Sequence, residues 1–402
     1  MRGRRPIVLV AAALACLGLA PLLLQLSCAP DTRKHLAPQD YTGRLVAPPL
    51  LRMAIHRGQL PVEIACDREC ILIGEGFKDG YKAMEILPPV QVSVADGHIV
   101  VGSDGVLSSE LTVTPLSDAF VQVKGTLYPG SIRIVVSEDG GLLVVNTVDV
   151  ETYLAGVVPA EMPSRWPLEA LKAQTVAART YALERKKERR NALYDLESST
   201  MDQVYSGWQE HLSAGVKDAL RETRGLVMLH ESRLFTAYFS STCGGHTLDA
   251  AGLMPAPDAA FIRGVACDFC KRSRRYSWSF EISRADLAAR LKEMGCDFGE
   301  ACRISAQRAG EFATVEHIIV ECDGVIGELP VEDFMRACGR QNFYSRRFGI
   351  SPTPSGIVVE GRGFGHGVGL CQYGALGMAK EGWEYDSILA YYYGDVELAR
   401  IY

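Results

Sequence analysis

The pattern of the chain changes at VDVETYLAGVVPAEMP (148–163) and WPLEALKAQTVAARTY (166–181). From the second stretch onward, Leu168, Leu171, Thr175, Ala178 and Ala182 recur at helical spacing, and the cationic run 186–190 suits the end of that helix. Upstream, over 51–146, short apolar runs alternate with Asp-Gly turns, as is typical of strands. We therefore predict an α+β fold, with a β-rich N-terminal part (50–146) followed by a mixed α/β domain (147–402).

A further α/β segment is expected within the second domain. Residues 276–340 read as a strand, a helix over Arg284–Met294 and more strands, and the motifs described below lie on both sides of them. We interpret 276–340 as an inserted segment. The same reading predicts helices at 211–223, 372–380 and 385–392, and strands at 226–229 and 234–239.

The N-terminus has the pattern of an export signal. Arg2, Arg4 and Arg5 precede an apolar run from Ile7 to Leu26. We expect 1–28 to be a signal peptide or an uncleaved membrane anchor, with Cys28 as a candidate lipoprotein site, and 29–49 to be a linker. Either alternative places the folded part outside the cytoplasm, in the cell envelope. As an anchor, or through a lipid on Cys28, the N-terminal segment is also the expected membrane contact.

The net charge of −6 on 402 residues argues against a nucleic-acid partner. An acidic, solvated surface is the simpler interpretation.

One carboxyl group stands out within the opening stretches. Val157, Val158, Pro159 and Met162 surround Glu161, and burial among apolar neighbours raises the pKa of a carboxyl group. Such a group can donate a proton to a leaving oxygen near neutral pH. The alternative is a glutamate that interacts with the N-terminal dipole of the helix that follows.

Three blocks together resemble the stage II sporulation protein D (SpoIID/LytB) family. The first is the pair of stretches around Glu161, the second is SSTCGGHT (240–247) and the third is GRGFGHGVGLCQYGA (361–375). They occur in the expected order, and the resemblance covers the chain from about Pro49 to the C-terminus.

The resemblance implies an enzyme of the bacterial cell wall. Family members act on peptidoglycan glycan strands, and the implied activity is that of a lytic transglycosylase, which cleaves the MurNAc–GlcNAc bond of peptide-stripped strands and leaves 1,6-anhydro ends. One carboxyl group suffices as acid and base, because the C6 hydroxyl of the sugar attacks its own anomeric carbon, whereas other glycosidases usually need two. Glu161 matches the catalytic glutamate, and Lys172 and Arg179 match positions linked to activity.

Other residues of the motifs are candidates for substrate binding: Asp202, Gln203, His366, Gln372 and Tyr373. The glycines around His366 permit positive φ or a close approach of the backbone to a ligand, and the pattern lacks the ending of a phosphate-binding loop. Structural alternatives stay open: ion pairing of Lys172 and Arg179 with Glu151 or Glu169, a polar turn at 202–203, and a buried structural histidine at His366.

Cys243-x-x-His246 and Cys267-x-x-Cys270 have the spacing of a tetrahedral zinc site. A structural Zn²⁺ is the expected cofactor, and no organic cofactor is expected. The alternatives are a Cys267–Cys270 disulfide with a free Cys243, and a His246 that acts at the substrate. For the remaining cysteines of an exported protein, disulfides of unknown pairing are the simplest interpretation: Cys66, Cys70, Cys296, Cys302, Cys322 and Cys338.

Two other function classes compete with the transglycosylase. One is a non-catalytic glycan-binding module that stimulates a cell-wall amidase, since relatives include amidase enhancers. The other is a zinc peptidase or amidase, which the absence of a His-Glu-x-x-His ligand set from the sequence disfavours.

Overall fold

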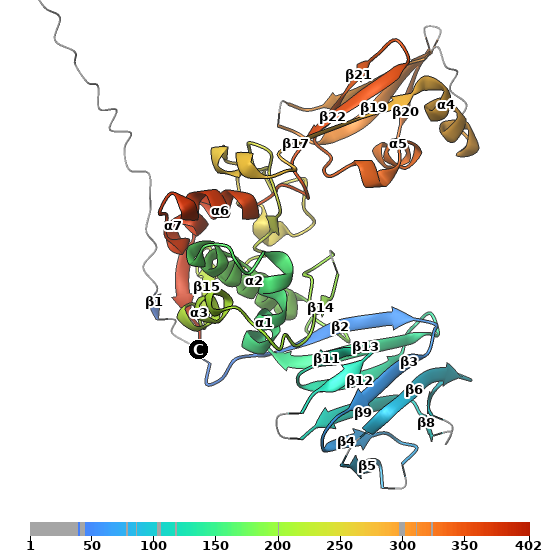
Figure 1. The fold of residues 1–402 in the computed structure, drawn as a ribbon, viewed down its shortest axis with the longest axis vertical. Helices are drawn as coiled ribbons and strands as arrows, with labels where there is room; N and C mark the ends of the chain where they lie inside the picture. Colours follow the sequence, from blue (N-terminus) through green and yellow to red (C-terminus); the bar gives the residue numbers. More distant parts are fainter. Residues whose placement is uncertain are drawn as a thin grey trace, which may run out of the picture. The chain divides into compact units, whose positions relative to one another are not determined.

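The computed structural model describes residues 39–40 and 45–402, apart from 78, 86, 103–105, 117–118, 200, 297–301, 311 and 323–324. The predicted export segment (1–28) lies outside the described residues, as does most of the predicted linker (29–49). None of the helices in the described ranges is both long enough and apolar enough to cross a membrane. The fold is α+β, as predicted, with helices and several separate sheets (Figure 1).

The predicted β-rich part forms two sheets. Six strands follow the order β11-β10-β3-β6-β7-β8, and seven follow the order β14-β2-β13-β12-β9-β4-β5. Alternate residues face inward, so that Ile132 and Ile134 of β12 are fully buried. The strands are β2 (Leu50–Gly58), β3 (Val62–Cys66), β4 (Cys70–Ile73), β5 (Tyr81–Met84), β6 (Leu87–Ala95), β7 (His98–Val101), β8 (Val106–Ser108), β9 (Glu110–Pro115), β10 (Val121–Val123), β11 (Thr126–Tyr128), β12 (Ser131–Val136), β13 (Leu142–Asp149) and β14 (Leu196–Glu197).

Helix α1 (Val150–Glu161) follows β13 directly and ends at Glu161. The Asp149 carboxylate caps it by accepting hydrogen bonds from the backbone N–H groups of Glu151 (3.0 Å) and Thr152 (3.1 Å). We predicted no helix over these residues, because Gly156 and Pro159 are unfavourable within a helix.

Gly156 allows the loop after β14 to pass close to α1. An added Cβ would lie 2.5 Å from the carbonyl oxygen of Gly207 and 2.6 Å from the ring of Tyr205. The Ser206 N–H also donates to the Gly156 carbonyl oxygen. A side chain at position 156 would therefore push this loop away from the helix.

We expect Gly156→Ala to lower the free energy of unfolding by about 1–3 kcal/mol, because the neighbours of the new methyl group include rigid backbone. Urea denaturation would measure the change. Gly349→Ala is the matched control, since an added Cβ there meets nothing within 4 Å. Equal stability of the two variants would show that the loop can move aside at little cost.

Helix α2 (Leu168–Glu188) is the predicted helix, confirmed within two residues at its end. Its small side chains Ala170, Ala173, Ala177 and Ala178 are fully buried, which lets neighbouring helices approach closely. Those helices are α1, α3 (Ala214–Glu222), α6 (Gln372–Lys380) and α7 (Tyr385–Tyr393). Strand β15 (Leu226–Leu229) covers α2 and pairs with β24 (Glu397–Arg400), which also pairs with β1 (Gln39–Asp40).

The predicted strand over 234–239 is wrong for most of its length. Only β16 (Phe239–Ser240) forms, beside β23 (Leu370–Cys371). The reason is local: both the backbone N–H and the hydroxyl of Thr236 donate to the Asp258 carboxylate, so this backbone donor is not available to a neighbouring strand. Short 3₁₀ turns lie at Pro257–Ala259, Asp268–Arg272 and Arg340–Asn342.

The inserted segment has its own hydrophobic core, which includes Trp278, Leu291, Ile318, Phe334 and Val359. Its two three-stranded sheets follow the orders β17-β22-β21 and β18-β19-β20. The elements are β17 (Ser277–Ser283), α4 (Arg284–Glu293), β18 (Arg303–Arg308), β19 (Val315–Cys322), β20 (Val325–Leu329), α5 (Val331–Ala337), β21 (Phe348–Pro352) and β22 (Gly356–Arg362). The limits 276–340 stay a prediction, although strands β21 and β22 pack in the same core.

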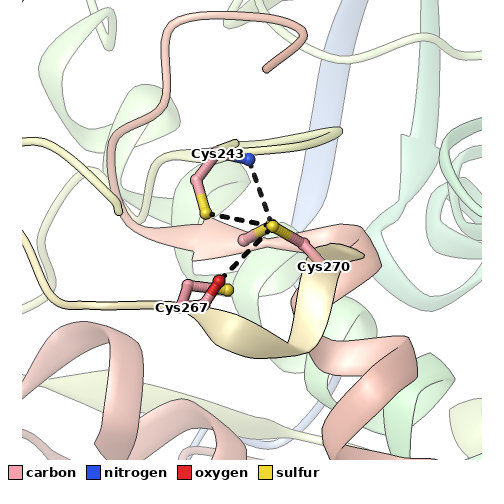
Figure 2. Close-up of side chains that lie close together, drawn as sticks. Cys243, Cys267 and Cys270 are labelled. Atoms are coloured by element: carbon pink, nitrogen blue, oxygen red, sulfur yellow. Dashed lines mark hydrogen bonds between the residues drawn. The ribbon is translucent and has the colours of Figure 1, made fainter. Parts of the chain in front are cut away.

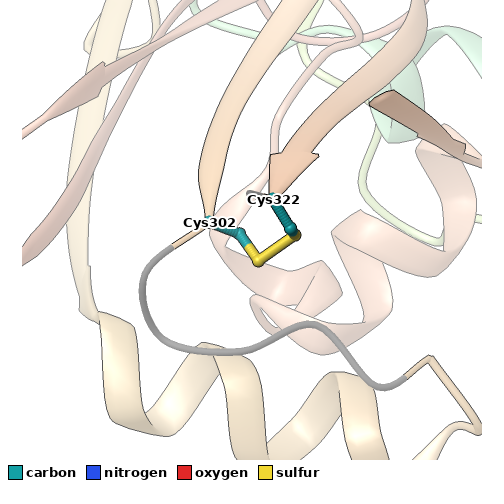
Figure 3. The surroundings of a disulfide bond; sticks show 2 residues. All are labelled: Cys302 and Cys322. Carbon is teal, nitrogen blue, oxygen red and sulfur yellow. A yellow bond between two sulfur atoms is a disulfide. The ribbon is translucent and has the colours of Figure 1, made fainter. Parts of the chain in front are cut away.

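A disulfide joins Cys302, just before β18, to Cys322 at the end of β19 (Figure 3). It links neighbouring antiparallel strands. The other cysteines for which a disulfide was expected, Cys66, Cys70, Cys296 and Cys338, are free thiols in the structure.

Candidate functional site

The Glu161 carboxyl group lies where three segments meet. It projects from the end of α1, and its Oε1 accepts a hydrogen bond from the Val204 backbone N–H at 3.0 Å. Its Oε2 lies 3.4 Å from the Nε2 of Gln372, the first residue of α6, which donates to it. The structure therefore brings two predicted site residues, Glu161 and Gln372, into contact.

The pKa of Glu161 is raised. Burial is the largest cause, and the hydrogen bonds from Val204 and Gln372 offset it only in part. Within the described residues, no cation forms an ion pair with this carboxyl group. Its place at the C-terminal end of α1, where the helix dipole is negative, also disfavours the carboxylate. The pKa of Glu161 is thus raised, as predicted from the sequence. The alternative, in which Glu161 interacts with the N-terminal dipole of the following helix, does not fit its position at the C-terminal end of α1.

Asp202 and Gln203 hold the loop that carries the Val204 N–H. Asp202 is almost fully buried and accepts hydrogen bonds from the Tyr181 hydroxyl (2.8 Å) and the Arg189 guanidinium (2.8 Å). Gln203 is fully buried, accepts from the Tyr153 hydroxyl at 2.7 Å and donates to the Ala178 carbonyl oxygen at 3.3 Å. Both side chains therefore position the loop, rather than line a groove as the sequence suggested.

Gln174 of α2 is a neighbour of the site that the sequence analysis missed. Its Oε1 lies 3.4 Å from the same Gln372 Nε2 that donates to Glu161. Its Nε2 is buried and makes no hydrogen bond within the part of the chain that the structure describes. The available signal was a glutamine within an otherwise apolar helix face, although many such residues have no role in a site.

His366 is held by backbone groups on both ring nitrogens. Its Nε2 lies 2.9 Å from the Phe239 carbonyl oxygen, and its Nδ1 accepts from the Val368 N–H at 3.1 Å. This arrangement requires the neutral ring with the proton on Nε2. Burial lowers its pKa to about 4. These contacts favour the structural alternative over a hydrogen bond from His366 to Glu161 or a sugar.

The glycines on either side of His366 have the backbone conformations expected from the sequence. Gly363, Gly365, Gly367 and Gly369 all have positive φ. The loop folds back over β16, because an added Cβ at Gly369 would lie 2.1 Å from the Tyr238 carbonyl oxygen.

Lys172 and Arg179 take part in ion pairs. The Lys172 ammonium contacts Glu169 (2.8 Å) and Glu222 (2.6 Å). Arg179 is fully buried and donates to both carboxylate oxygens of Glu151 at 2.9 Å. Because Lys172 lies two residues from Gln174, it projects about 200° around α2 from the side that faces Gln372.

Tyr373 contributes an aromatic surface next to Gln372. Its ring packs edge-on against Trp166, with 5.0 Å between ring centroids, and both rings are partly exposed. Trp166 lies five residues after Glu161, and Tyr373 directly follows Gln372, which donates to the Glu161 carboxyl group.

A cysteine cluster forms where β23 ends and α6 begins. The side chains of Cys243, Cys267 and Cys270 point toward one another (Figure 2), and Cys371 completes a group whose sulfur atoms all lie within 4.8 Å of one another. His246 is not a member: its Nδ1 contacts the Thr247 carbonyl oxygen, and its ring stacks on Phe312. Among the four predicted residues, His246 is therefore replaced in the cluster by Cys371.

The sequence could not identify Cys371 as the fourth member, because spacing reveals only pairs that are close along the chain. His246 follows Cys243 by three residues, but its ring stacks on Phe312 and is not part of the sulfur cluster.

Residues 138–230, which include Glu161 and the loop 202–205, match the family described as "Stage II sporulation protein" (SpoIID). An uncharacterized protein of Brachyspira hyodysenteriae is 33% identical over 277 residues, which cover 69% of this chain and 73% of the relative. The stage II sporulation protein D of Bacillus subtilis is 28% identical over 64% of this chain and 76% of its own length. The amidase enhancer of the same organism is 28% identical over 60% of this chain, but only 39% of that protein is covered.

Proposed function

Because the chain belongs to the SpoIID family of stage II sporulation proteins, we propose that it acts on the bacterial cell wall as a lytic transglycosylase. The substrate is the MurNAc–GlcNAc linkage of peptidoglycan glycan strands stripped of their peptides. The observation that carries this proposal is the partly buried carboxyl group of Glu161, whose pKa is raised and which forms no ion pair with a cation of the described residues.

Glu161 supplies the acid from Oε2. Its Oε1 accepts the shorter hydrogen bond, from Val204, and in a protonated carboxyl group the carbonyl oxygen is the better acceptor. The proton therefore resides on Oε2, the oxygen with the weaker contact at 3.4 Å. That oxygen needs only a small displacement of the Gln372 amide to donate to a glycosidic oxygen.

The reaction balances without water. Glu161 protonates the glycosidic oxygen as the bond from that oxygen to C1 of the muramic acid breaks. The C6 hydroxyl oxygen then bonds to the same C1, and its proton passes to the Glu161 carboxylate. The acid is regenerated, and one strand ends in a 1,6-anhydro sugar. A single carboxyl group thus performs both steps.

Other residues position this group or the sugar. Asp202 and Gln203 fix the Val204 amide, and Gln372 orients Oε2. The unpaired Nε2 of Gln174 is a buried donor that a polar substrate group or water would satisfy. The partly exposed rings of Trp166 and Tyr373 suit a sugar face.

The decisive experiment incubates the purified chain with glycan strands from which an amidase has removed the stem peptides. Mass spectrometry of the products should find 1,6-anhydro-muramic acid ends. Reducing muramic acid ends would show hydrolysis instead, and intact strands would show that the chain does not cleave glycan.

The second candidate is a glycan-binding module that stimulates a cell-wall amidase. The name of the Bacillus subtilis relative, "Amidase enhancer", favours it. It predicts that the chain increases amidase turnover on peptidoglycan, and that replacement of Glu161 leaves the increase unchanged. The two candidates therefore differ in whether Glu161 is needed.

We place the reaction outside the cytoplasm, in the cell envelope. The export pattern in 1–28 and the Cys302–Cys322 disulfide both support this location, since disulfides persist in oxidising compartments. Cys28 would supply a lipid anchor if the segment is processed as a lipoprotein signal.

The pH dependence of cleavage should report the pKa of Glu161. The acid step needs the protonated carboxyl group, so kcat/KM should fall as the pH rises through that raised pKa. Gln372→Leu removes a donor that lowers this pKa, so the alkaline limb of the profile should move to higher pH. The measurement is kcat/KM against pH on peptide-stripped strands.

Gln209→Leu is the matched control, because the half-exposed Gln209 amide donates to Ser206 and, in the part of the chain that the structure describes, has no hydrogen bond to Glu161. Its profile should coincide with that of the parent chain. An alkaline limb that stays in place in Gln372→Leu would mean that another group titrates.

A further inference from the structure

Four buried cysteines from distant parts of the chain form a compact sulfur cluster. Cys243 follows β16, Cys267 and Cys270 lie at the 3₁₀ turn Asp268–Arg272, and Cys371 ends β23. Their residues are at most 1% exposed, and all four sulfur atoms lie within 4.8 Å of one another.

We propose that Cys243, Cys267, Cys270 and Cys371 bind one Zn²⁺ ion as a structural site. Four thiolates at about 2.3 Å from a tetrahedral ion lie about 3.8 Å from one another. The sulfur atoms of Cys243 and Cys270 are 3.6 Å apart. The site thus already has the dimensions of a mononuclear tetrathiolate centre, and four protein ligands leave no open position for catalysis.

The groups around the sulfur atoms suit thiolates. The backbone N–H groups of Cys243 and Gly374 point at the Cys371 sulfur, at 3.2 and 3.3 Å. The Tyr392 hydroxyl lies 3.1 Å from the sulfur of Cys267. Such donors to metal-bound sulfur orient the ligands and offset their negative charge.

Gly374 leaves the space that the sulfur cluster needs. A Cβ added at Gly374 would lie 2.8 Å from the Cys267 sulfur and 1.8 Å from the Tyr392 hydroxyl oxygen. Only glycine at this position allows the first turn of α6 and its N–H group to approach the sulfur atoms this closely.

The alternative to a metal site is a disulfide between two of these cysteines. The 3.6 Å between the Cys243 and Cys270 sulfur atoms is far longer than the bond of about 2.05 Å, whereas Cys302 and Cys322 of the same chain are bonded. A single disulfide would also leave two buried thiols with donors aimed at them. A shared ion uses all four sulfur atoms.

The ion would stabilise the segment that carries the proposed catalytic contact. Cys371 is the N-cap of α6, and the next residue, Gln372, donates to Glu161. Zinc would therefore tie the start of α6 to the segments of Cys243 and of Cys267 and Cys270. This inference does not depend on glycan cleavage, because it concerns only the metal and the fold.

The first test measures zinc in the full chain, purified under reducing conditions without chelator. Inductively coupled plasma mass spectrometry should find about one zinc per chain. The Cys371→Ser variant should retain less than a tenth of this zinc. Cys338→Ser, a buried free thiol outside the cluster, and His246→Ala should keep the full amount. Full zinc in Cys371→Ser, or its loss in His246→Ala, would overturn the ligand set.

A second test uses the parent chain alone, in case Cys371→Ser does not fold. Exchange of the bound metal for Co²⁺ should produce the visible bands of tetrahedral thiolate coordination. Disulfide mapping by mass spectrometry should find the four cysteines as free thiols. Chains without metal, chains that contain iron, or a disulfide between two of these residues would each refute the zinc site.

Discussion

Glu161→Gln should reduce cleavage of peptide-stripped glycan strands by at least about 100-fold, since a positioned acid–base group contributes about 10²–10⁴ to a rate. The amide keeps an acceptor for the Val204 N–H, which lies 3.0 Å from Oε1 in the parent chain. It cannot release a proton to the glycosidic oxygen or take one from the C6 hydroxyl. The measurement is the rate at which 1,6-anhydro ends appear.

A measurement of stability distinguishes a loss of catalysis from a loss of folding in Glu161→Gln. The folded-state pKa of Glu161 is raised, so ionisation of this group costs folding free energy once the pH exceeds the pKa of the unfolded chain. Glu161→Gln removes that cost and should unfold at the same urea concentration as the parent at neutral pH, or at a higher one.

Glu222→Gln, an exposed carboxyl group that pairs with Lys172, is the matched control and should retain activity. Equal rates for Glu161→Gln and the parent would remove Glu161 from the mechanism and leave the amidase-stimulating function as the better candidate.

Arg179→Leu should lower the free energy of unfolding by about 3–5 kcal/mol, the range for removal of one partner from a buried ion pair. The guanidinium holds both oxygens of Glu151 and also donates to the Leu226 carbonyl oxygen at 3.0 Å. It therefore joins α1, α2 and β15, and its removal leaves a buried carboxylate without a cation. Urea denaturation would measure the loss.

Arg221→Leu is the control, because Arg221 is 68% exposed and its pair with Asp218 lies at the surface, where such pairs contribute about 0–1 kcal/mol. Burial would raise the pKa of Glu151, but Arg179 more than offsets it, so the pKa is lowered. The pair's stabilisation is complete above the pKa of an unfolded glutamate and is lost as the pH falls through the lowered value.

The stability difference between Arg179→Leu and the parent should accordingly shrink in acid. If Arg179→Leu instead keeps the stability of the parent but loses activity per folded molecule, Arg179 contacts substrate, as the family resemblance implied.

Local features of the fold could be predicted from the sequence. Helix α6 begins and ends where the pattern indicated, α7 extends one residue further, and β15 matches the predicted strand. Each of these depends on periodicity or on neighbours within a few residues. The raised pKa of Glu161 was also predictable, because its apolar neighbours Val158 and Met162 lie within three residues of it in sequence.

Features that depend on distant partners could not be predicted. The Asp258 carboxylate binds Thr236 across 22 residues and prevents a strand that the local pattern favours. Cys371 contacts Cys243 across 128 residues. The spacing of cysteines along the sequence therefore could not indicate that Cys371 belongs to the cluster. The ion pair between Arg179 and Glu151 was one of the alternatives left open, and the structure decided for it.

The amide of Val204 has a consequence for how this protein can be dissected genetically. Every amino acid except proline supplies the same N–H at that position, so a scan that swaps side chains one by one would record Val204 as unimportant. The dependence would surface instead at Tyr153 and Tyr181, whose hydroxyls hold the loop in place. The contribution of this backbone N–H to the pKa of Glu161 would therefore escape a scan of single side-chain substitutions.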